Sequence, residues 1–404
     1  FENKGTFTVK DSKGGGQIIA RGNFNYGTMT LESGSIVACD GNGGYGVRNY
    51  EGATFVMNGG SISTSLEDDH QVNNGGYDAT TLRVDNGAKA TINGGTITNV
   101  SNYTIALDNY GDVTINGGTF TSAHTVIGNE AAGATLTING GKFTCNGADQ
   151  SSSHAVYSET GTTTINGGEF DGNGNNVWTD TGATVNIYGG DFKQTNSGSF
   201  NTDKGTINVM GGFYFDNPHA RVADGYLEIE INPTLYTVMK YRDDAYIIED
   251  TFDYNKFCEI VELGYYFAGK VVRLANDIDL SLDREAEASN DPIAMFNGTF
   301  DGDGHAIKNL YQSGWYFGYE WGSYGSIGMF SELENATIKN LVIDGLYAVI
   351  EGGDISFIAG SATGDCVFEN IEIKNSKIGT YNNGCGGIIG WSGAGSYTFK
   401  DIKI

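Results

Sequence analysis

The stretch ATINGGTIT, at residues 90–98, opens a series of near-copies along the first half of the chain. The copies are VTINGGTFT (113–121), LTINGGKFT (136–144), TTINGGEFD (163–171) and VNIYGGDFK (185–193). Their Gly-Gly doublets belong to a longer series that begins at Gly59, Gly94, Gly117, Gly140, Gly167, Gly189 and Gly211. The spacing is 22–27 residues apart from one gap of 35, and a near-constant period of this length indicates a repeat architecture.

Each unit is predicted to hold three short strands. Alternating apolar residues such as Val113 and Ile115 precede a doublet, and a single Phe or Ile such as Phe120 follows it, which is strand periodicity interrupted by a turn. One unit cannot bury its apolar side, whereas units stacked about 4.8 Å apart enclose a continuous core. We therefore predict an all-β chain built as a parallel β-helix, right-handed because parallel crossover connections have that hand. A leucine-rich repeat has a similar period, but these units lack its leucine pattern.

The residues beside the doublets are predicted to be structural. One register is occupied by Asn58, Asn93, Asn116, Asn139 and Asn166, which indicates a ladder of stacked side-chain amides. Glycine supplies the positive φ that such turns require. Glycine amides can also bind anions, but the structural role is favoured.

Composition narrows the classes of function. The chain has 404 residues, 62 of them Gly and 3 Pro, which is typical of short strands joined by tight turns. With 49 acidic and 23 basic residues the net charge is −26, which repels nucleic acid and anionic lipid headgroups. No apolar run is long enough to span a membrane, and no cofactor motif is present.

The five cysteines are expected to be small buried hydrophobes, because no C-x-x-C pair occurs. Cys366 and Cys385 are close enough in one module to be a candidate disulfide. The chain opens at Phe1 without a signal peptide and stops at Ile404 in mid-pattern, so we expect that both ends belong to a longer protein.

Three regions are predicted. Residues 1–215 form the first β-helix, 216–250 a cap or bridging strands, and 251–404 a second β-helical domain with a period of about 30 residues. The segment 252–264 has Phe257, Ile260, Val261 and Leu263 at helical spacing. It is predicted to be a capping helix that starts at Asp253 and ends at Gly264.

The second half also carries a resemblance. KVVRLANDIDLS (270–281), FNGTFDGDGHAIKNL (296–310) and the later GMF and IIG segments resemble the GLUG-type repeat modules of bacterial surface proteins, some of them in IgA-cleaving peptidases. The first half resembles the TINGG-type β-helix repeats of large Gram-positive gut surface proteins. Both resemblances imply extracellular display, and neither implies chemistry.

The search for a catalytic site yields few candidates. Zinc-protease, nucleophile-elbow and Walker motifs are missing from the sequence. A β-helical polysaccharide lyase or hydrolase would need paired acids or a base. The scattered candidates are Glu67, Asp68, Asp69, His70 and Asp203. Asp301 and Asp303, beside His305 in a Gly-rich turn, are candidate calcium ligands, because carboxylates two residues apart can share a hard cation.

Aromatic residues suggest a binding surface. A second turn glycine lies six or seven residues before each doublet, at Gly52, Gly87, Gly111, Gly133, Gly161, Gly182 and Gly205. Counting four residues back from each of these glycines predicts an outward column of Arg48, Arg83, Leu107, Asn129, Tyr157, Trp178 and Asn201. Tyr157 and Trp178 would lie on adjacent coils and could stack on sugar rings. The second half adds Trp315, Tyr319 and Trp321 in one Gly-interleaved loop, either as loop packing or as a contact surface.

The sequence thus favours a non-catalytic stalk or adhesin-like module, displayed on a bacterial surface or secreted. Its ligand would be a host or dietary glycan, or a host protein such as an immunoglobulin. The alternatives are a polysaccharide lyase or hydrolase on a β-helix scaffold and a passive spacer of a larger cell-wall protein. Neither the ligand nor the oligomeric state follows from the sequence.

Overall fold

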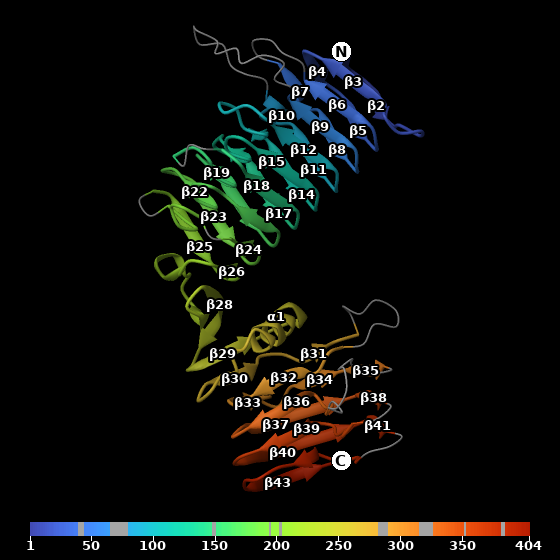
Figure 1. Cartoon of the computed structure of the whole chain (residues 1–404), viewed down its shortest axis with the longest axis vertical. Helices are drawn as coiled ribbons and strands as arrows, with labels where there is room; N and C mark the ends of the chain where they lie inside the picture. The colour runs from blue at the N-terminus through green and yellow to red at the C-terminus, as the bar shows by residue number, and fades with distance from the viewer. Residues whose placement is uncertain are drawn as a thin grey trace. The chain divides into compact units, whose positions relative to one another are not determined.

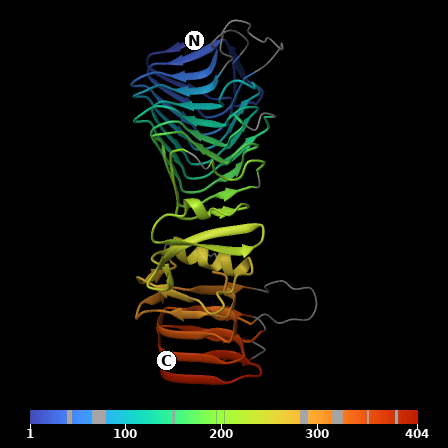
Figure 2. The same cartoon turned by 90° about the vertical axis from the view of Figure 1, so that its left-hand side faces the viewer.

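The computed structural model describes residues 1–38, 44–64, 80–147, 151–193, 195–201, 204–281, 290–314, 326–350, 353–380 and 384–404. Its contacts divide the chain into two compact units, Phe1–Val238 and Met239–Ile404. The division falls inside the 216–250 stretch that was expected to be a cap or bridge. Nearly all regular structure in both units is strand (Figures 1 and 2), and the predicted all-β parallel β-helix is confirmed.

The first unit has three walls, and each coil contributes one strand to each wall, except that the last coil meets the first sheet only through an isolated bridge from Phe200 to Val177. The first sheet contains β1 (Glu2–Asn3), β4 (Gly22–Asn25), β7 (Tyr45–Asn49), β10 (Thr80–Val84), β13 (Leu107–Asn109), β16 (Ile127–Asn129), β19 (Val156–Ser158) and β22 (Val177–Thr179). The second contains β2 (Thr6–Val9), β5 (Thr28–Leu31), β8 (Thr54–Met57), β11 (Lys89–Ile92), β14 (Asp112–Ile115), β17 (Thr135–Ile138), β20 (Thr162–Ile165), β23 (Thr184–Ile187) and β25 (Thr206–Val209). The third contains β3 (Gln17–Ala20), β6 (Ser35–Ala38), β9 (Ser61–Thr64), β12 (Thr96–Asn99), β15 (Thr119–Ser122), β18 (Lys142–Cys145), β21 (Glu169–Asp171), β24 (Asp191–Phe192) and β26 (Phe213–Tyr214).

The core consists of columns of side chains that run along the axis. Parallel strands lie about 4.8 Å apart, so residues at one register stack directly on one another. The aromatic column contains Phe120, Phe143, Phe170, Phe192 and Tyr214. All five are almost fully buried, and successive ring centroids lie 4.7–5.0 Å apart. Where an aromatic residue follows the doublet, its ring packs into this column.

The predicted asparagine ladder is confirmed. Each of Asn93, Asn116, Asn139 and Asn166 donates its side-chain amide to the Asn side chain of the preceding coil, at 2.8 Å in every case. Asn58 starts the ladder and donates to Glu32 Oε1 at 2.9 Å. The second glycine of each doublet adopts a φ of 76–115°, a conformation that favours glycine. The doublets are therefore turn elements.

Length variation among the coils is concentrated at one corner, the connection from the third sheet to the first. This connection joins Asn99 to Leu107 in one coil, Cys145 to Val156 in another and Thr64 to Thr80 in a third. The strands of the second sheet remain in register from coil to coil across these differences. Insertions are therefore absorbed without disturbing the ladders.

The second unit is also a stack of parallel strands. Short elements lead to it: the 3-10 helix η1 (His219–Arg221), β27 (Tyr226–Asn232) and β28 (Leu235–Arg242). Its long wall contains β29 (Ala245–Ile248), β30 (Val271–Leu274), β31 (Ile278–Asp279), β33 (Thr299–Asp301), β34 (Ala306–Lys308), β37 (Thr337–Asp344), β40 (Cys366–Lys374) and β43 (Tyr397–Lys403). The other walls contain β32 (Ile293–Phe296), β36 (Phe330–Glu334), β39 (Ala359–Thr363) and β42 (Ile389–Ser392), and β35 (Tyr311–Gly314), β38 (Tyr347–Ile350) and β41 (Lys377–Thr380).

The helix α1 (Thr251–Glu262) packs on the core of this second stack. Its Phe257 ring centroid lies 5.3 Å from that of Phe267 and 5.9 Å from that of Phe296. The N-cap is Asp250, whose side chain accepts the N–H of Asp253, so the predicted start was three residues late. The predicted end at Gly264 is confirmed by its φ of +99°.

Two further expectations fail in part. Leu263 was expected on the buried face of α1, but it is the C-cap residue and is 43% exposed. The described cysteines, Cys145, Cys258, Cys366 and Cys385, are all free, so the candidate disulfide is not formed. Cys385 is exposed, so the cysteines are not all buried, and Cys39 lies outside the described residues. No helix in the described ranges is long and apolar enough to cross a membrane.

Candidate functional site

The outer face of the first sheet carries a row of matched positions. Strand pairing aligns, on successive coils, Arg48, Arg83, Asp108, Gly128, Tyr157 and Trp178. These six residues are called the outer row below. The row begins with three charged side chains, passes a glycine, and ends with two aromatic side chains.

The predicted column was wrong on three coils. Leu107, Asn129 and Asn201 are buried and do not belong to the outer row. Asn201 is held by a neighbouring coil, where its Oδ1 accepts the N–H of Thr179 at 2.8 Å. The turn before Gly111 is one residue shorter than in the other coils, and the turn before Gly133 is one residue longer. Counting back from the turn glycine therefore misplaced two of the three residues.

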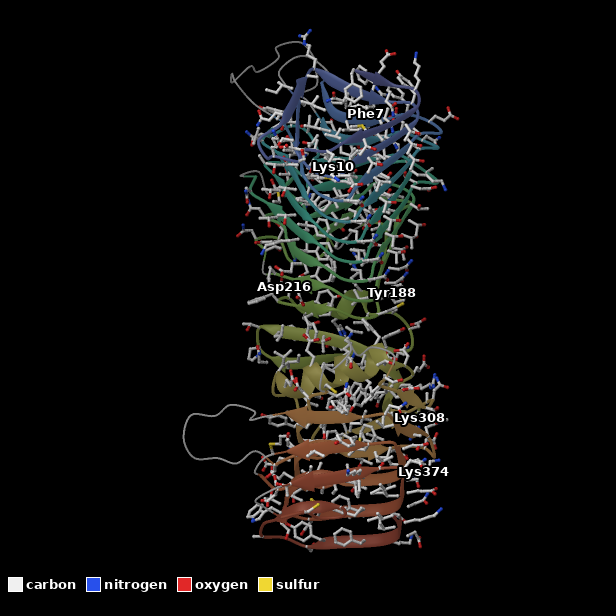
Figure 3. All side chains as sticks on the ribbon, turned by 90° about the vertical axis from the view of Figure 1, so that its right-hand side faces the viewer. Phe7, Lys10, Tyr188, Asp216, Lys308 and Lys374 are labelled. Atoms are coloured by element: carbon white, nitrogen blue, oxygen red, sulfur yellow. The ribbon has the colours of Figure 1, made fainter. Side chains whose placement is uncertain are left out.

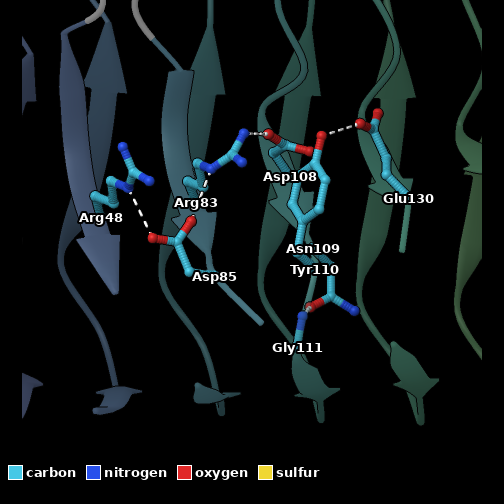
Figure 4. Close-up of polar contacts among 8 residues, drawn as sticks. All are labelled: Arg48, Arg83, Asp85, Asp108, Asn109, Tyr110, Gly111 and Glu130. Atoms are coloured by element: carbon cyan, nitrogen blue, oxygen red, sulfur yellow. Dashed lines mark hydrogen bonds and ion pairs between the residues drawn. The ribbon is translucent and has the colours of Figure 1, made fainter. Parts of the chain in front are cut away.

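Two arginines and two aspartates form an ion-pair network (Figure 4). Arg48 Nε lies 2.8 Å from Asp85 Oδ2, and Arg83 Nε lies 2.9 Å from Asp85 Oδ1. Arg83 Nη1 reaches onward to Asp108 Oδ2 at 2.8 Å. The Arg83 guanidinium also lies over the Tyr110 ring, 4.1 Å from its centroid. Both arginines are thus neutralised by partners on their own face.

Next along the row, two carboxyl groups from adjacent coils meet. Gly128 has no side chain, and a Cβ there would lie 2.8 Å from Glu130 Oε1. The Glu130 side chain therefore lies across this strand, beside Asp108 on the preceding coil. Glu130 Oε2 accepts a hydrogen bond of 2.5 Å from the Tyr110 hydroxyl.

The surroundings of Asp108 and Glu130 favour one proton on the pair. Asp108 is only 7% exposed, and its Oδ1 atom is buried with no donor among the described residues. Burial, followed by the charge of Glu130, raises the pKa of Asp108 to about 7, although Arg83 opposes the shift. Burial likewise raises the pKa of Glu130, which Tyr110 opposes and Glu159 reinforces. Two ionised carboxylates would repel each other here, whereas one proton between them forms a hydrogen bond.

A buried asparagine positions these groups. Asn109 follows Asp108 in β13 and its side chain points inward. Its Oδ1 accepts the N–H of Gly111 at 2.9 Å (Figure 4). Its amide donates to Asn129 Oδ1 at 2.9 Å. These bonds fix the strand end that carries Tyr110. Because Asn109 points inward, the residue before it, Asp108, must face outward. The position of this inward Asn therefore gives the correct register of the outer row, whereas the glycine spacing does not.

The pair has limited catalytic capability. A carboxyl group with a pKa near 7 can act as a general acid at neutral pH. Glycosidases, however, separate their two carboxyl groups by about 5–5.5 Å for retention or about 6.5–9.5 Å for inversion. Asp108 and Glu130 come from adjacent coils, and the charge of Glu130 raises the pKa of Asp108. Such a pair of carboxyl groups is suited to binding a proton.

Tyr157 and Trp178 are neighbours on adjacent coils, as predicted, and both are half-buried. The Trp178 ring stacks on the imidazole of His154, with centroids 4.9 Å apart, instead of on Tyr157. Burial and then the charges of Glu159, Asp180 and Glu130 raise the pKa of Tyr157 to about 12. Tyr157 is therefore a partly open aromatic side chain among carboxylates.

The candidate calcium ligands have separate surroundings. Asp301 is 5% exposed, and its Oδ2 lies 3.3 Å from Lys339 Nζ and 3.7 Å from Arg273 Nε. Its Oδ1 accepts the side-chain amide of Asn340 at 2.9 Å. Burial opposes ionisation, but the hydrogen bonds and Lys339 hold the pKa of Asp301 below its usual range. Asp303 is exposed in a positive-φ turn, and no group of three metal-binding side chains forms among the described residues. Calcium binding here stays a prediction.

The remaining sequence candidates lie outside the described residues. They are Trp315, Tyr319 and Trp321 of the aromatic loop, and Glu67, Asp68, Asp69, His70 and Asp203 of the catalytic search. Conversely, Asp85, Asp108, Tyr110 and Glu130 were not singled out from the sequence. They lie at strand ends whose register depends on the variable turns.

Comparisons with known proteins give one partial likeness. Over 135 residues, 29% of this chain, the sequence is 31% identical to Halomucin of Haloquadratum walsbyi. The matched chain spans about 1% of the length of that curated relative. No family model matches, and no solved structure matches. The likeness covers less than a third of this chain and shows no family.

Proposed function

We propose that this chain is a non-catalytic binding module, displayed on a cell surface, whose first sheet recognises a glycan along its outer row. The carrying observation is the register of Tyr157 beside Trp178, both half-buried, next to an ordered run of charged side chains. Sugar rings offer C–H faces to aromatic rings and hydroxyl groups to charged side chains. A row along the β-helix axis matches the extended shape of a polysaccharide.

Two observations support display and rigidity. The partial likeness to Halomucin supports a surface location. The aromatic column and the asparagine ladder tie each coil of the first unit to the next, as a stalk requires.

The test is a glycan array probed with the whole chain and with a Tyr157→Ala, Trp178→Ala double variant. We expect selective binding that the double variant loses. The control is Tyr188→Ala, because Tyr188 is 42% exposed and directly follows strand β23 of the second sheet (Figure 3). Binding that survives the double variant would contradict the assigned surface. A blank array would exclude the glycan and leave a host protein ligand or a passive spacer.

A further inference from the structure

Three carboxylates share one position on consecutive coils beside the outer row. The backbone N–H groups of Glu130, Glu159 and Asp180 each donate to the preceding coil, at 2.9, 3.0 and 2.8 Å. Their backbones are therefore spaced by the strand separation, about 4.8 Å. These three residues are called the acidic column below. Such a column concentrates negative charge along the axis.

Cations compensate only part of this charge. Lys204 Nζ lies 3.2 Å from Asp180 Oδ1. Arg83 pairs with Asp85 and Asp108 instead. No ion pair in the described part of the chain reaches Glu130 or Glu159, although the charge of Arg83 acts on Glu130 from a distance. The mutual repulsion of Glu130 and Glu159 would be relieved by a bound cation.

Beside the acidic column, the buried carboxyl group of Asp108 has an unfilled place for a hydrogen-bond donor. Asp108 Oδ1 has no donor among the described residues, in a carboxyl group that is 7% exposed and lies beside Glu130. Leaving a buried carboxylate oxygen without a donor is costly. A proton fills that place in the free protein. A ligand that brings both positive charge and a hydrogen-bond donor to this pair can replace this proton.

The chemistry of the surroundings selects the kind of cation. Metal ions prefer several carboxylate oxygens, and no group of three suitable side chains forms among the described residues. An ammonium group instead donates hydrogen bonds to separate carboxylates and interacts favourably with an aromatic face. Tyr157 supplies such a face between Glu130 and Asp180, and no hydrogen bond joins its hydroxyl to any described residue.

We propose that the acidic column and Tyr157 bind a glycan that carries free amino groups, and that binding releases the proton shared by Asp108 and Glu130. The inference rests on the proposed function and names its ligand class. Ammonium groups of successive amino sugars would face successive carboxylates. N-acetylation removes both the positive charge and the donors, so the acetylated glycan should lose this recognition.

The experiment compares glucosamine oligomers with N-acetylglucosamine oligomers of equal length by titration calorimetry on the whole chain. At about pH 6 both the ammonium groups and the shared proton are in place. We expect at least tenfold tighter binding of the amine form, about 1.4 kcal/mol. Repeating the titration in buffers of different ionisation enthalpy should reveal net proton release.

The variant is Glu130→Gln, which keeps an acceptor for Tyr110 and adds a donor toward Asp108. It should lose both the amine preference and the proton release. Glu159→Gln, at an exposed position, tests the same column if Glu130→Gln fails to fold. Glu169→Gln is the control, because Glu169 pairs with Lys142 on the third sheet.

The outcomes separate the two proposals. An amine preference that disappears in Glu130→Gln or Glu159→Gln supports the inference. Equal binding of both oligomers, or binding only of other glycans on the array, overturns the inference and leaves the proposed function standing. Absence of any glycan binding overturns both.

Discussion

At the scale of single residues, one glycine determines the chemistry of the outer row. Any side chain at position 128 would occupy the space that Glu130 fills. Without that space Glu130 would extend into solvent, and Asp108 would pair only with Arg83. Burial is the main cause of the raised pKa of Asp108, and the second cause, the charge of Glu130, depends on the absence of a Cβ on the neighbouring coil.

Replacing Asp108 with Asn should remove a pH dependence of stability. The pKa of Asp108 rises from 3.8 to about 7 on folding, so between these values the folded state holds a proton that the unfolded chain has lost. The free energy of unfolding therefore falls as the pH rises through this window, and levels off above it. Asn mimics the protonated acid, so Asp108→Asn should be more stable than the wild type at pH 8, by on the order of 1–3 kcal/mol.

Urea unfolding at pH 5 and pH 8 measures this difference. The matched control is Asp112→Asn, since Asp112 is exposed and bound to Thr135 and Lys89. It should leave the pH dependence of the wild type unchanged. An equal loss of stability between pH 5 and pH 8 in Asp108→Asn and wild type would show that the pair holds no proton.

At the scale of elements, the ladders explain why the repeat tolerates little change at a few positions. Phe170 lies between Phe143 and Phe192, with ring centroids 5.0 and 4.8 Å away. Each ring is both core filler and spacer for the next coil. A missing ring leaves a cavity that neighbouring coils, fixed by their backbone hydrogen bonds, cannot close.

Phe170→Ala should accordingly destabilise the first unit by about 3–5 kcal/mol. Chemical denaturation followed by circular dichroism would measure the loss. Phe215→Ala is the comparison, because Phe215 is 39% exposed and its removal should cost less than about 1 kcal/mol. A Phe170→Ala variant as stable as Phe215→Ala would mean that the column is not a stabilising element.

Some structural elements could be predicted from local sequence patterns, and others could not. The β-helix, the asparagine ladder and the end of α1 followed from local patterns, since glycine turns and period-two alternation depend on neighbours in the chain. The outer row did not, because turns of unequal length before Gly111 and Gly133 shift the register. The proton shared by Asp108 and Glu130 depends on contacts between coils, which no local pattern encodes.

At the scale of the whole molecule, charge is the dominant property. The net charge of −26 opposes compaction through self-repulsion. Ion pairs across coils, such as Lys142 with Glu169 and Lys374 with Asp344, offset only part of this net charge. Lys374 lies on the surface of the second unit (Figure 3). The protein should therefore be more stable where mobile ions screen the repulsion.

Raising NaCl from about 20 mM to about 300 mM should increase the midpoint of the first thermal transition, because the screening length shortens several-fold. Differential scanning calorimetry at constant pH would record the shift. Sucrose at matched osmolality separates screening from solute exclusion. A midpoint that falls with added salt would mean that the cross-coil ion pairs outweigh the net repulsion.

The unequal corner between the third and first sheets has a consequence for how such a molecule can diversify. Three walls are held by repeated contacts, whereas this connection changes length from Asn99–Leu107 to Cys145–Val156 with the strand register intact. It leads directly into the strands that carry the outer row. The sequence and length of this connection can therefore vary beside the candidate binding surface while the strands of the scaffold keep their register.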